Sequence, residues 1–414
     1  MRSTDDGPAR SGGARRRRLP RAVRGRRRYG ALLAVGALVT AGALAAQAVS
    51  ASEDAHPRAG TGNPVEAAPG HCGAGWAHPH PGPQRLTVRN GGNLPVEVRL
   101  QDAASGAVLA EVEELAPGTS RPMPVRLGPG TYRLLCLPSG GDAMSGPAVS
   151  VSGPGERGPA VRPVTEHDLI PVALAYQRWV TGRLTPLQAD ADALRDALSR
   201  GERGAARRAW QTAHLSYERL GAAYGAFGEL NDALDGTADG LPHGTADRDF
   251  TGFHRIEYGL WHGESLTRLR TEADRLTSTV ARLRAQWART EVDPADIGLR
   301  AHEIVEDTIE LQLSGRTDYG SGTTLATARA DLDGTAEVLG LLRPLLTSRL
   351  PHPERIDRAL DTARRRLDAQ RHDGTWTPLR RLGRTDRERI DAAFGDLVEE
   401  LAPVAVVCEP RRTA

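Results

Sequence analysis

Hydrophobic and polar residues alternate with a period of two between residues 72 and 153. The alternating runs are short, and each is bounded by glycine, proline or asparagine, the residues of turns. Their spacing, about 8 to 12 residues from one run to the next, is typical of a β-sandwich. The pattern therefore predicts an all-β domain at 72–153, with strands in the runs "QRLTVRN", "PVEVRLQD", "AVLAEVEEL", "SRPMPVRLG", "GTYRLLCLP" and "GPAVSVSG".

After a glycine- and proline-rich linker at 154–165, the apolar residues follow the helical period as far as residue 407. Capping signals mark some helix starts, such as Thr185 and Pro186 with Gln188 two positions later. A run of helices with short connections predicts an all-α helical bundle. The expected helices are 166–182, 186–200, 203–227, 251–262, 265–289, 294–314, 322–347, 353–371 and 385–403.

The first 51 residues have the composition of an export signal. An arginine-rich segment precedes the apolar stretch Tyr29–Ala48, and the small residues Val49–Ala51 offer a cleavage site. An uncleaved signal anchor formed by residues 29–48 is the alternative. Either interpretation exports the rest of the chain to the cell surface, the periplasm or the extracellular medium, after a proline- and glycine-rich linker at 52–71.

Charge and cysteine content narrow the function classes. The formal net charge is +2, and much of the positive surplus lies ahead of residue 30, so the remainder disfavours nucleic acid as a partner. In an exported protein Cys72 and Cys136 can form a disulfide, although either could instead supply a metal thiolate. Cys408 opens the tail 408–414.

The stretch "DFTGFHRIEYGLWHG" places a carboxylate inside an apolar helix face. On a helical wheel, Phe253, Ile256 and Trp261 lie on one arc, Glu257 falls inside that arc, and His254 lies at its margin. A buried lone carboxylate costs several kcal/mol, so it must be paired, protonated or bound to a metal. The spacing leaves two explanations: an arginine from another helix, or a cation held by His254 and Glu257.

Other clusters could contribute to such a site. His214 and Glu218 stand four residues apart on the flank of the apolar stripe of 203–227, where a solvated position is common for these residue types. His302, with glutamates at 303, 306 and 310, lacks the second histidine of a zinc peptidase helix. His78 and His80 near Cys72 could bind a metal or simply be exposed in a loop.

Four further segments stand out: "SYERLGAAYGAFGELNDALD", "FTGFHRIEYGLW", "AHEIVEDTIELQLSGRTDYGSGTTLATARADLDGTAEVLGLLRPLL" and "DRERIDAAFGDLVEELAPVA". In this order they resemble the imelysin-domain proteins of the EfeO type, secreted components of bacterial iron uptake. With the β-rich region, which resembles the cupredoxin-like domain of many members, the resemblance covers about residues 72 to 407 and implies an imelysin-like domain at 166–407. No histidine lies between Cys136 and Met144, so a blue-copper centre is not expected in the β domain.

The resemblance implies metal ligands at His254, Glu257, Glu218 and Asp235. Gly221 departs from it, because many members carry a second glutamate at that place. Imidazole with carboxylate oxygens suits iron, as Fe²⁺ or Fe³⁺, and can also hold zinc or copper.

The implied function is capture of iron outside the membrane and its delivery to a membrane iron permease, with a haem peroxidase of the same system as second partner. A metallopeptidase-like hydrolase using the H-x-x-E site is the first alternative, although no separate general base can be assigned. A haem- or polysaccharide-binding module is the second, but aromatic residues make up only 4% of the chain and give little stacking surface.

Overall fold

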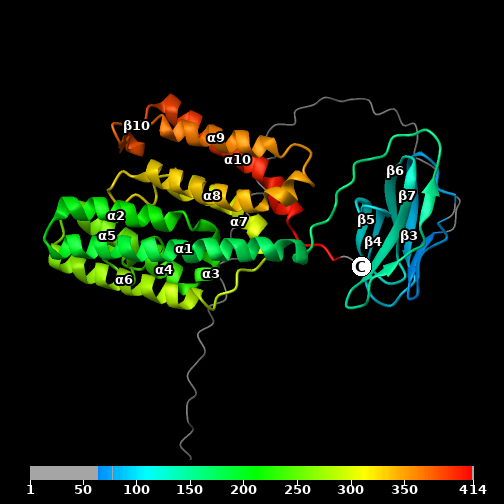
Figure 1. The fold of residues 1–414 in the computed structure, drawn as a ribbon, viewed down its shortest axis with the longest axis horizontal. Helices are drawn as coiled ribbons and strands as arrows, with labels where there is room; N and C mark the ends of the chain where they lie inside the picture. Colours follow the sequence, from blue (N-terminus) through cyan, green and yellow to red (C-terminus); the bar gives the residue numbers. More distant parts are fainter. Residues whose placement is uncertain (1–63, 77, 413–414) are drawn as a thin grey trace, which may run out of the picture. The chain divides into compact units, whose positions relative to one another are not determined.

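The computed structural model describes residues 64–76 and 78–412 (Figure 1). A strand-rich region, residues 65 to 151, precedes a helical region that continues to residue 407, which confirms the predicted two-part fold class. The export signal or anchor predicted at 1–51 lies outside the described residues. Among the described helices, none combines the length and the apolar character that crossing a bilayer demands.

The β domain contains two sheets. One has the strand order β2-β1-β3-β6, and the other has the order β5-β4-β7-β8, with β9 also paired to β7. Inward-facing side chains such as Val88, Val98 and Leu134 are at most 1% exposed and form the core between the sheets. The strands are β1 (Val65–Ala68), β2 (His71–Ala74), β3 (Gly82–Asn90), β4 (Val96–Asp102), β5 (Val108–Leu115), β6 (Ser120–Leu127), β7 (Gly130–Pro138), β8 (Met144–Ser145) and β9 (Val149–Val151).

A disulfide joins the two sheets. Cys72 of β2 is bonded to Cys136 of β7 across a sequence separation of 64 residues. The third cysteine, Cys408, is free and buried, and burial raises the pKa of its thiol to about 11.

The segment 52–71, expected to be a linker, contains strand β1 and the first residue of β2. Strand β1 pairs in parallel with β3, so its partner lies about 20 residues further along the chain. A strand of four residues beside prolines and glycines has too little alternation to be recognised, and it is fixed by this non-local pairing.

The helical domain begins with one long helix where two were expected. Helix α1 runs unbroken from Glu166 to Ser199 with Pro186 inside it, so the predicted break between 182 and 186 is wrong. Proline removes one backbone hydrogen bond there. The flanking Leu184 and Leu187 are at most 2% exposed, and their burial keeps the helix continuous.

Two further boundaries differ from the expectation. Helix α2 ends at Glu218 rather than 227, and the chain then passes through the turn η1 and two short helices, of which the second was not expected at all. Helix α7 ends at Asp307 and continues as a π-helical turn, η3 (Thr308–Gln312). The other helices follow the predictions within three residues at their starts and within four at their ends.

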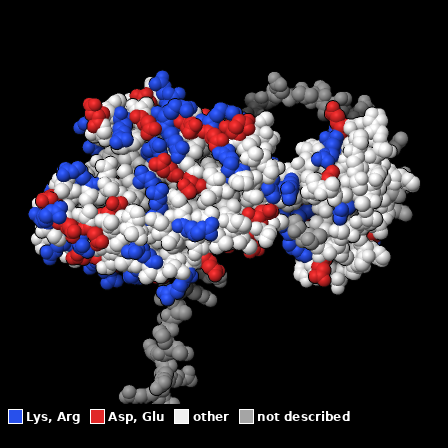
Figure 2. Space-filling model, in the orientation of Figure 1, with Lys and Arg blue, Asp and Glu red and all other residues white. Residues whose placement is uncertain are grey.

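The helices pack around one hydrophobic core. Helix α1 lies beside α2 and α6, and α10 lies beside α7 and α9 (Figure 1). Figure 2 shows acidic and basic side chains interspersed on the visible face of these helices, as solvated helix faces require. The remaining bounds are α2 (Arg203–Glu218), η1 (Gly221–Ala223), α3 (Tyr224–Phe227), α4 (Glu229–Asp235), η2 (Gly244–Ala246), α5 (Gly252–Trp261), α6 (Leu266–Trp287), α7 (Asp296–Asp307), α8 (Thr324–Thr347), α9 (Glu354–Asp368), β10 (Arg371–His372), β11 (Thr375–Trp376), η4 (Leu379–Arg381) and α10 (Arg384–Val407).

Candidate metal centre

Three helices bring the polar residues of the core together. His214 and Glu218 lie one turn apart on α2, Asp235 is the last residue of α4, and His254 and Glu257 lie on α5. Residues three or four apart on a helix share a face, which explains both pairs.

Gly252 allows α4 and α5 to meet at this point. Its φ is +78°, and a Cβ there would stand 2.1 Å from the carbonyl oxygen of Leu234. Only glycine fits this close approach of backbone to backbone. The first turn of α5 therefore abuts the last turn of α4, which places His254 beside Asp235.

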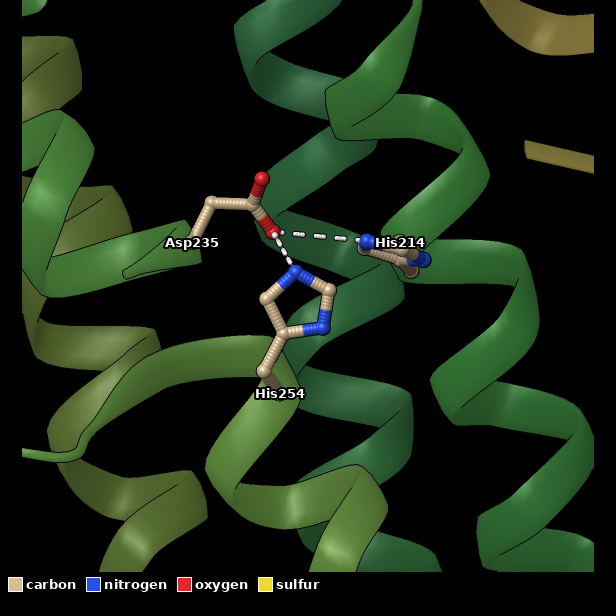
Figure 3. A group of neighbouring side chains, drawn as sticks. All are labelled: His214, Asp235 and His254. Carbon is tan, nitrogen blue, oxygen red and sulfur yellow. Dashed lines mark ion pairs between the residues drawn. The ribbon is translucent and has the colours of Figure 1, made fainter. Parts of the chain in front are cut away.

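Asp235 lies between two imidazoles (Figure 3). Its Oδ1 is 3.3 Å from Nε2 of His214 and 3.5 Å from Nε2 of His254. Oε1 of Glu218 lies 2.7 Å from the same nitrogen of His214. One nitrogen or oxygen from each of His214, Asp235 and His254 lies within 4.8 Å of the other two, a spacing that can hold a metal ion.

The atoms that converge here are buried and have no hydrogen-bond partner within the described part of the chain. They are Nε2 of His214, Oε1 of Glu218 and Oδ1 of Asp235. Nε2 of His214 lies 2.7 Å from Oε1 of Glu218 and 3.3 Å from Oδ1 of Asp235, but without hydrogen-bond geometry to either. Each unsatisfied buried polar group costs about 1–3 kcal/mol. A cation held between His214, Asp235 and His254 would satisfy the atoms of His214 and Asp235 directly.

Glu257 occupies a different place. As the helical wheel predicted, it is buried, with 1% of its surface exposed. Its Oε2 is 3.4 Å from Nδ1 of His254, and its Oε1 accepts a hydrogen bond from the backbone N–H of Ser321 at 3.0 Å. Within the described residues, no arginine forms an ion pair or a hydrogen bond with Glu257. The alternative explanation, an arginine from another helix, is therefore not observed.

A second layer of polar groups surrounds Glu218. The hydroxyl of Tyr224 donates to Oε2 of Glu218 at 3.2 Å, and the hydroxyl of Thr308 donates to Oδ2 of Asp331 at 3.0 Å. Burial raises the pKa of Asp331 well above its usual range, and the neighbouring charge of Glu218 raises it further. Burial and the neighbouring Glu218 therefore both disfavour the charged form of Asp331.

Both histidines have raised pKa values. Burial alone would lower the pKa of His214, but the charges of Glu218 and Asp235 outweigh it and raise the pKa well above 6.5. Burial likewise opposes the charged form of His254, and Asp235 and Glu257 overcome it, so its pKa is also raised. Without a metal, the positive charge of the protonated imidazoles offsets the carboxylates that a cation would otherwise bind.

The structure brings the four expected residues, His254, Glu257, Glu218 and Asp235, into one cluster. His214, expected on a solvated flank, is 3% exposed and lies inside the cluster. Its spacing of four residues from Glu218 was the available signal. Asp331 was missed, because nothing in "ARADLDG" distinguishes it from Asp333, two residues further along.

Other candidates lie elsewhere. His302 pairs with Glu306 on the same helix, at 3.3 Å. A second acidic group in the described residues comprises Glu97, Glu111 and Glu113 of the β domain, where Nε of Arg99 already lies 3.6 Å from Glu111. Neither metal-capable group includes His78 or His80.

The fold and site define a helical bundle with a buried cluster of imidazoles and carboxylates that suits a cation. The sequence profile of the imelysin family, Peptidase_M75, matches residues 173–404, more than half of the chain, and the protein belongs to this family. It is an imelysin protein of the EfeO type.

Two relatives are both called "Iron uptake system component EfeO". The one from Yersinia pseudotuberculosis is 28% identical over 297 residues, 71% of this chain and 78% of the relative. The one from Escherichia coli O157:H7 is 26% identical over 300 residues, with the same two shares. A crystal structure of a Parabacteroides distasonis protein aligns with a TM-score of 0.44 and 12% identity, covering 59% of this chain and 96% of that one.

Proposed function

We propose that this protein is an exported iron-binding component of a bacterial iron uptake system, which captures iron in its helical domain and delivers it to a membrane permease. The observation that carries the proposal is a buried nitrogen, Nε2 of His214, that lies near an oxygen of Glu218 and an oxygen of Asp235, all three without a hydrogen-bond partner in the described residues. The relatives named as components of an iron uptake system supply the identity of the cargo.

The donor set is compatible with iron without being exclusive to it. Imidazole nitrogens and carboxylate oxygens bind iron, zinc and copper, and affinity alone would favour copper. Iron would therefore be selected by the geometry of the site and by the supply of metal outside the membrane. The proposed ligands are Nε2 of His214 and His254 and the carboxylates of Glu218 and Asp235.

Burial of the site supports binding rather than peptide hydrolysis, despite the family's peptidase name. A hydrolytic metal needs an open coordination position that a substrate can reach. His214, Glu218 and His254 are at most 3% exposed, and the adjoining cavity offers about 10 Å³ for a water-sized sphere. A peptide backbone does not fit in that space.

The proposed partners follow from the role. A captured ion must be handed to a membrane iron permease, and a haem peroxidase of the same system is the second proposed partner. Because a permease that imports iron takes it from the outer side of the membrane, the proposal requires that this chain is exported.

The test is metal binding by the purified exported chain. Fe²⁺ under anaerobic conditions, Fe³⁺ as a soluble chelate, and Zn²⁺ would each be dialysed to equilibrium against the protein, and bound metal counted by mass spectrometry. His254→Ala should lose binding, whereas His262→Ala, an exposed histidine at the end of the same helix, should keep it. Equal binding by the two variants would overturn the assignment.

A further inference from the structure

Glu257 differs from the other carboxylates of the cluster in how its oxygens are engaged. Oε1 of Glu218 and Oδ1 of Asp235 have no hydrogen-bond partner and face the histidines' Nε2 atoms. Both oxygens of Glu257 have partners: the ring nitrogen Nδ1 of His254 at 3.4 Å and the backbone N–H of Ser321 at 3.0 Å. Glu257 is therefore satisfied in the absence of a cation.

The two ring nitrogens of His254 point to different partners. Nε2 lies 3.5 Å from Asp235, where the unpartnered atoms gather, and Nδ1 lies against Glu257. A neutral imidazole carries one proton, so the nitrogen that donates to a carboxylate leaves the other free for a metal. A cation bound by Nδ1 and Glu257 would instead lie on the opposite side of the ring from Asp235.

The loop between η3 and α8 keeps this pair in place. Ser321 holds Oε1 of Glu257 through its amide, and the ring of Tyr319 packs against the ring of His254, with centroids 5.3 Å apart. Tyr319 is itself anchored, because its hydroxyl oxygen accepts the backbone N–H of Ala238 at 2.7 Å. The loop thus restrains both the imidazole and the carboxylate that orients it.

We propose that Glu257 is a positioning residue and not a metal ligand: it accepts the Nδ1–H of His254 and so turns Nε2 toward the cation shared with His214, Asp235 and Glu218. This inference rests on the proposed function, and it departs from the expectation that both residues of the H-x-x-E motif bind the metal. Hydrogen bonds of this kind fix the tautomer and the orientation of a metal-binding histidine, and their loss costs about 10- to 100-fold in affinity.

The decisive measurement is which ring nitrogen of His254 carries the proton in the Zn²⁺-loaded protein. Zn²⁺ is the probe because it is diamagnetic, and long-range ¹H–¹⁵N correlation spectra distinguish the two nitrogens of each histidine. His254→Gln identifies the His254 signals by their loss. The proposal expects a protonated Nδ1 and a zinc-bound Nε2. A protonated Nε2 with zinc on Nδ1 would overturn it.

Two matched variants supply the second readout. Glu257→Gln keeps an oxygen that can accept the Nδ1–H, so it should bind one Co²⁺ about tenfold more weakly with the visible spectrum of the wild type. Glu218→Gln replaces a proposed ligand and should change that spectrum. If Glu257→Gln shifts the Co²⁺ bands as Glu218→Gln does, Glu257 is a ligand and the proposal is wrong.

The failure of the proposed function would look different. If the wild-type protein binds none of iron, Zn²⁺ and Co²⁺, the cluster is not a metal site and the proposed function is wrong. Metal binding through Nδ1 of His254 would leave the site standing and reject only the role given to Glu257. Circular dichroism of each variant separates loss of binding from loss of folding.

Discussion

Replacing Asp235 with asparagine tests the centre of the proposed site most directly. One oxygen of Asp235 approaches both imidazoles, at 3.3 and 3.5 Å, and 15% of the side chain is exposed. The substitution keeps the size of the side chain and removes its charge. Its effect on metal binding therefore reports the electrostatic contribution of this carboxylate.

The expected loss follows from the charge that is removed. An interaction of a charged group in a mostly buried position contributes about 1.5–3 kcal/mol. Because Asp235 faces two proposed ligands and keeps little contact with solvent, the upper value applies, and about 3 kcal/mol corresponds to about 100-fold in the dissociation constant. Binding is weakened and not abolished, since the amide oxygen and the other ligands remain.

The assay is competition for Zn²⁺ or Fe²⁺ against a chelator of known affinity. Asp232→Asn is the matched control, because Asp232 is an exposed residue on the same short helix and the change in net charge is identical. The control should bind as the wild type does. If both variants bind alike, Asp235 is not a ligand and the proposed centre lies elsewhere.

Three further predictions concern protons, packing and the disulfide. The pKa values of His214 and His254 are raised in the metal-free protein, so metal binding at pH 7 should release protons and the metal affinity should keep rising with pH beyond about 6.5. Calorimetry in buffers of different ionisation enthalpy measures the proton release, and its absence would contradict the prediction. Gly221→Glu should lower the free energy of unfolding by about 1–3 kcal/mol without tightening metal binding, because a Cβ at 221 would stand 3.1 Å from Cγ1 of Ile304. Chemical denaturation of this variant beside Gly221→Ala checks the stability, and tighter metal binding would show that a glutamate can be accommodated. Replacing both Cys72 and Cys136 with serine should lower the free energy of unfolding of the β domain by up to about 4 kcal/mol, the loop-closure estimate for a separation of 64 residues. An unchanged denaturation midpoint of that domain would refute this prediction.

Much of the fold was accessible from the sequence because the two hydrophobic periods are distinct. The period of two ends where the helical period begins, and long amphipathic helices such as α6 were expected within two residues of their observed ends. Burial of Glu257 followed from the wheel alone, since Phe253 and Ile256 fix which face of α5 is inward.

The errors have tertiary causes. Pro186 after Thr185 has the sequence pattern of a helix start, but the buried residues on both sides of it keep α1 continuous. Helix α4 has seven residues, fewer than two full turns of pattern, and its end is set by contact with Gly252. Arg255, which lies on α5 away from the arc of Phe253 and Ile256, is nevertheless 5% exposed and paired with Glu264, so that side of the helix is covered as well.

The contacts between the site residues were harder to predict from the sequence than the residues themselves. Sequence spacing relates residues on one helix, such as His214 with Glu218 or His254 with Glu257. It does not show which atom of each side chain faces the other helices. The distinction between an orienting carboxylate and a ligand depends on Ser321, 64 residues away along the chain from Glu257.

Charge balance at the site gives a last prediction, for the oxidation state of the bound iron. When the metal displaces the protons of His214 and His254, the imidazoles are neutral, and burial beside Glu218 raises the pKa of Asp331 and so disfavours its charged form. The carboxylates of Glu218, Asp235 and Glu257 then carry three negative charges, which Fe³⁺ balances and Fe²⁺ leaves one charge short. Because uncompensated buried charge is costly, Fe³⁺ should bind more tightly, which lowers the Fe³⁺/Fe²⁺ potential by about 59 mV for each tenfold difference in affinity. Asp235→Asn removes one of the three charges and should raise the potential of bound iron relative to the wild type. A potential that stays the same or falls in this variant would show that the charge of the cluster does not select the ferric ion.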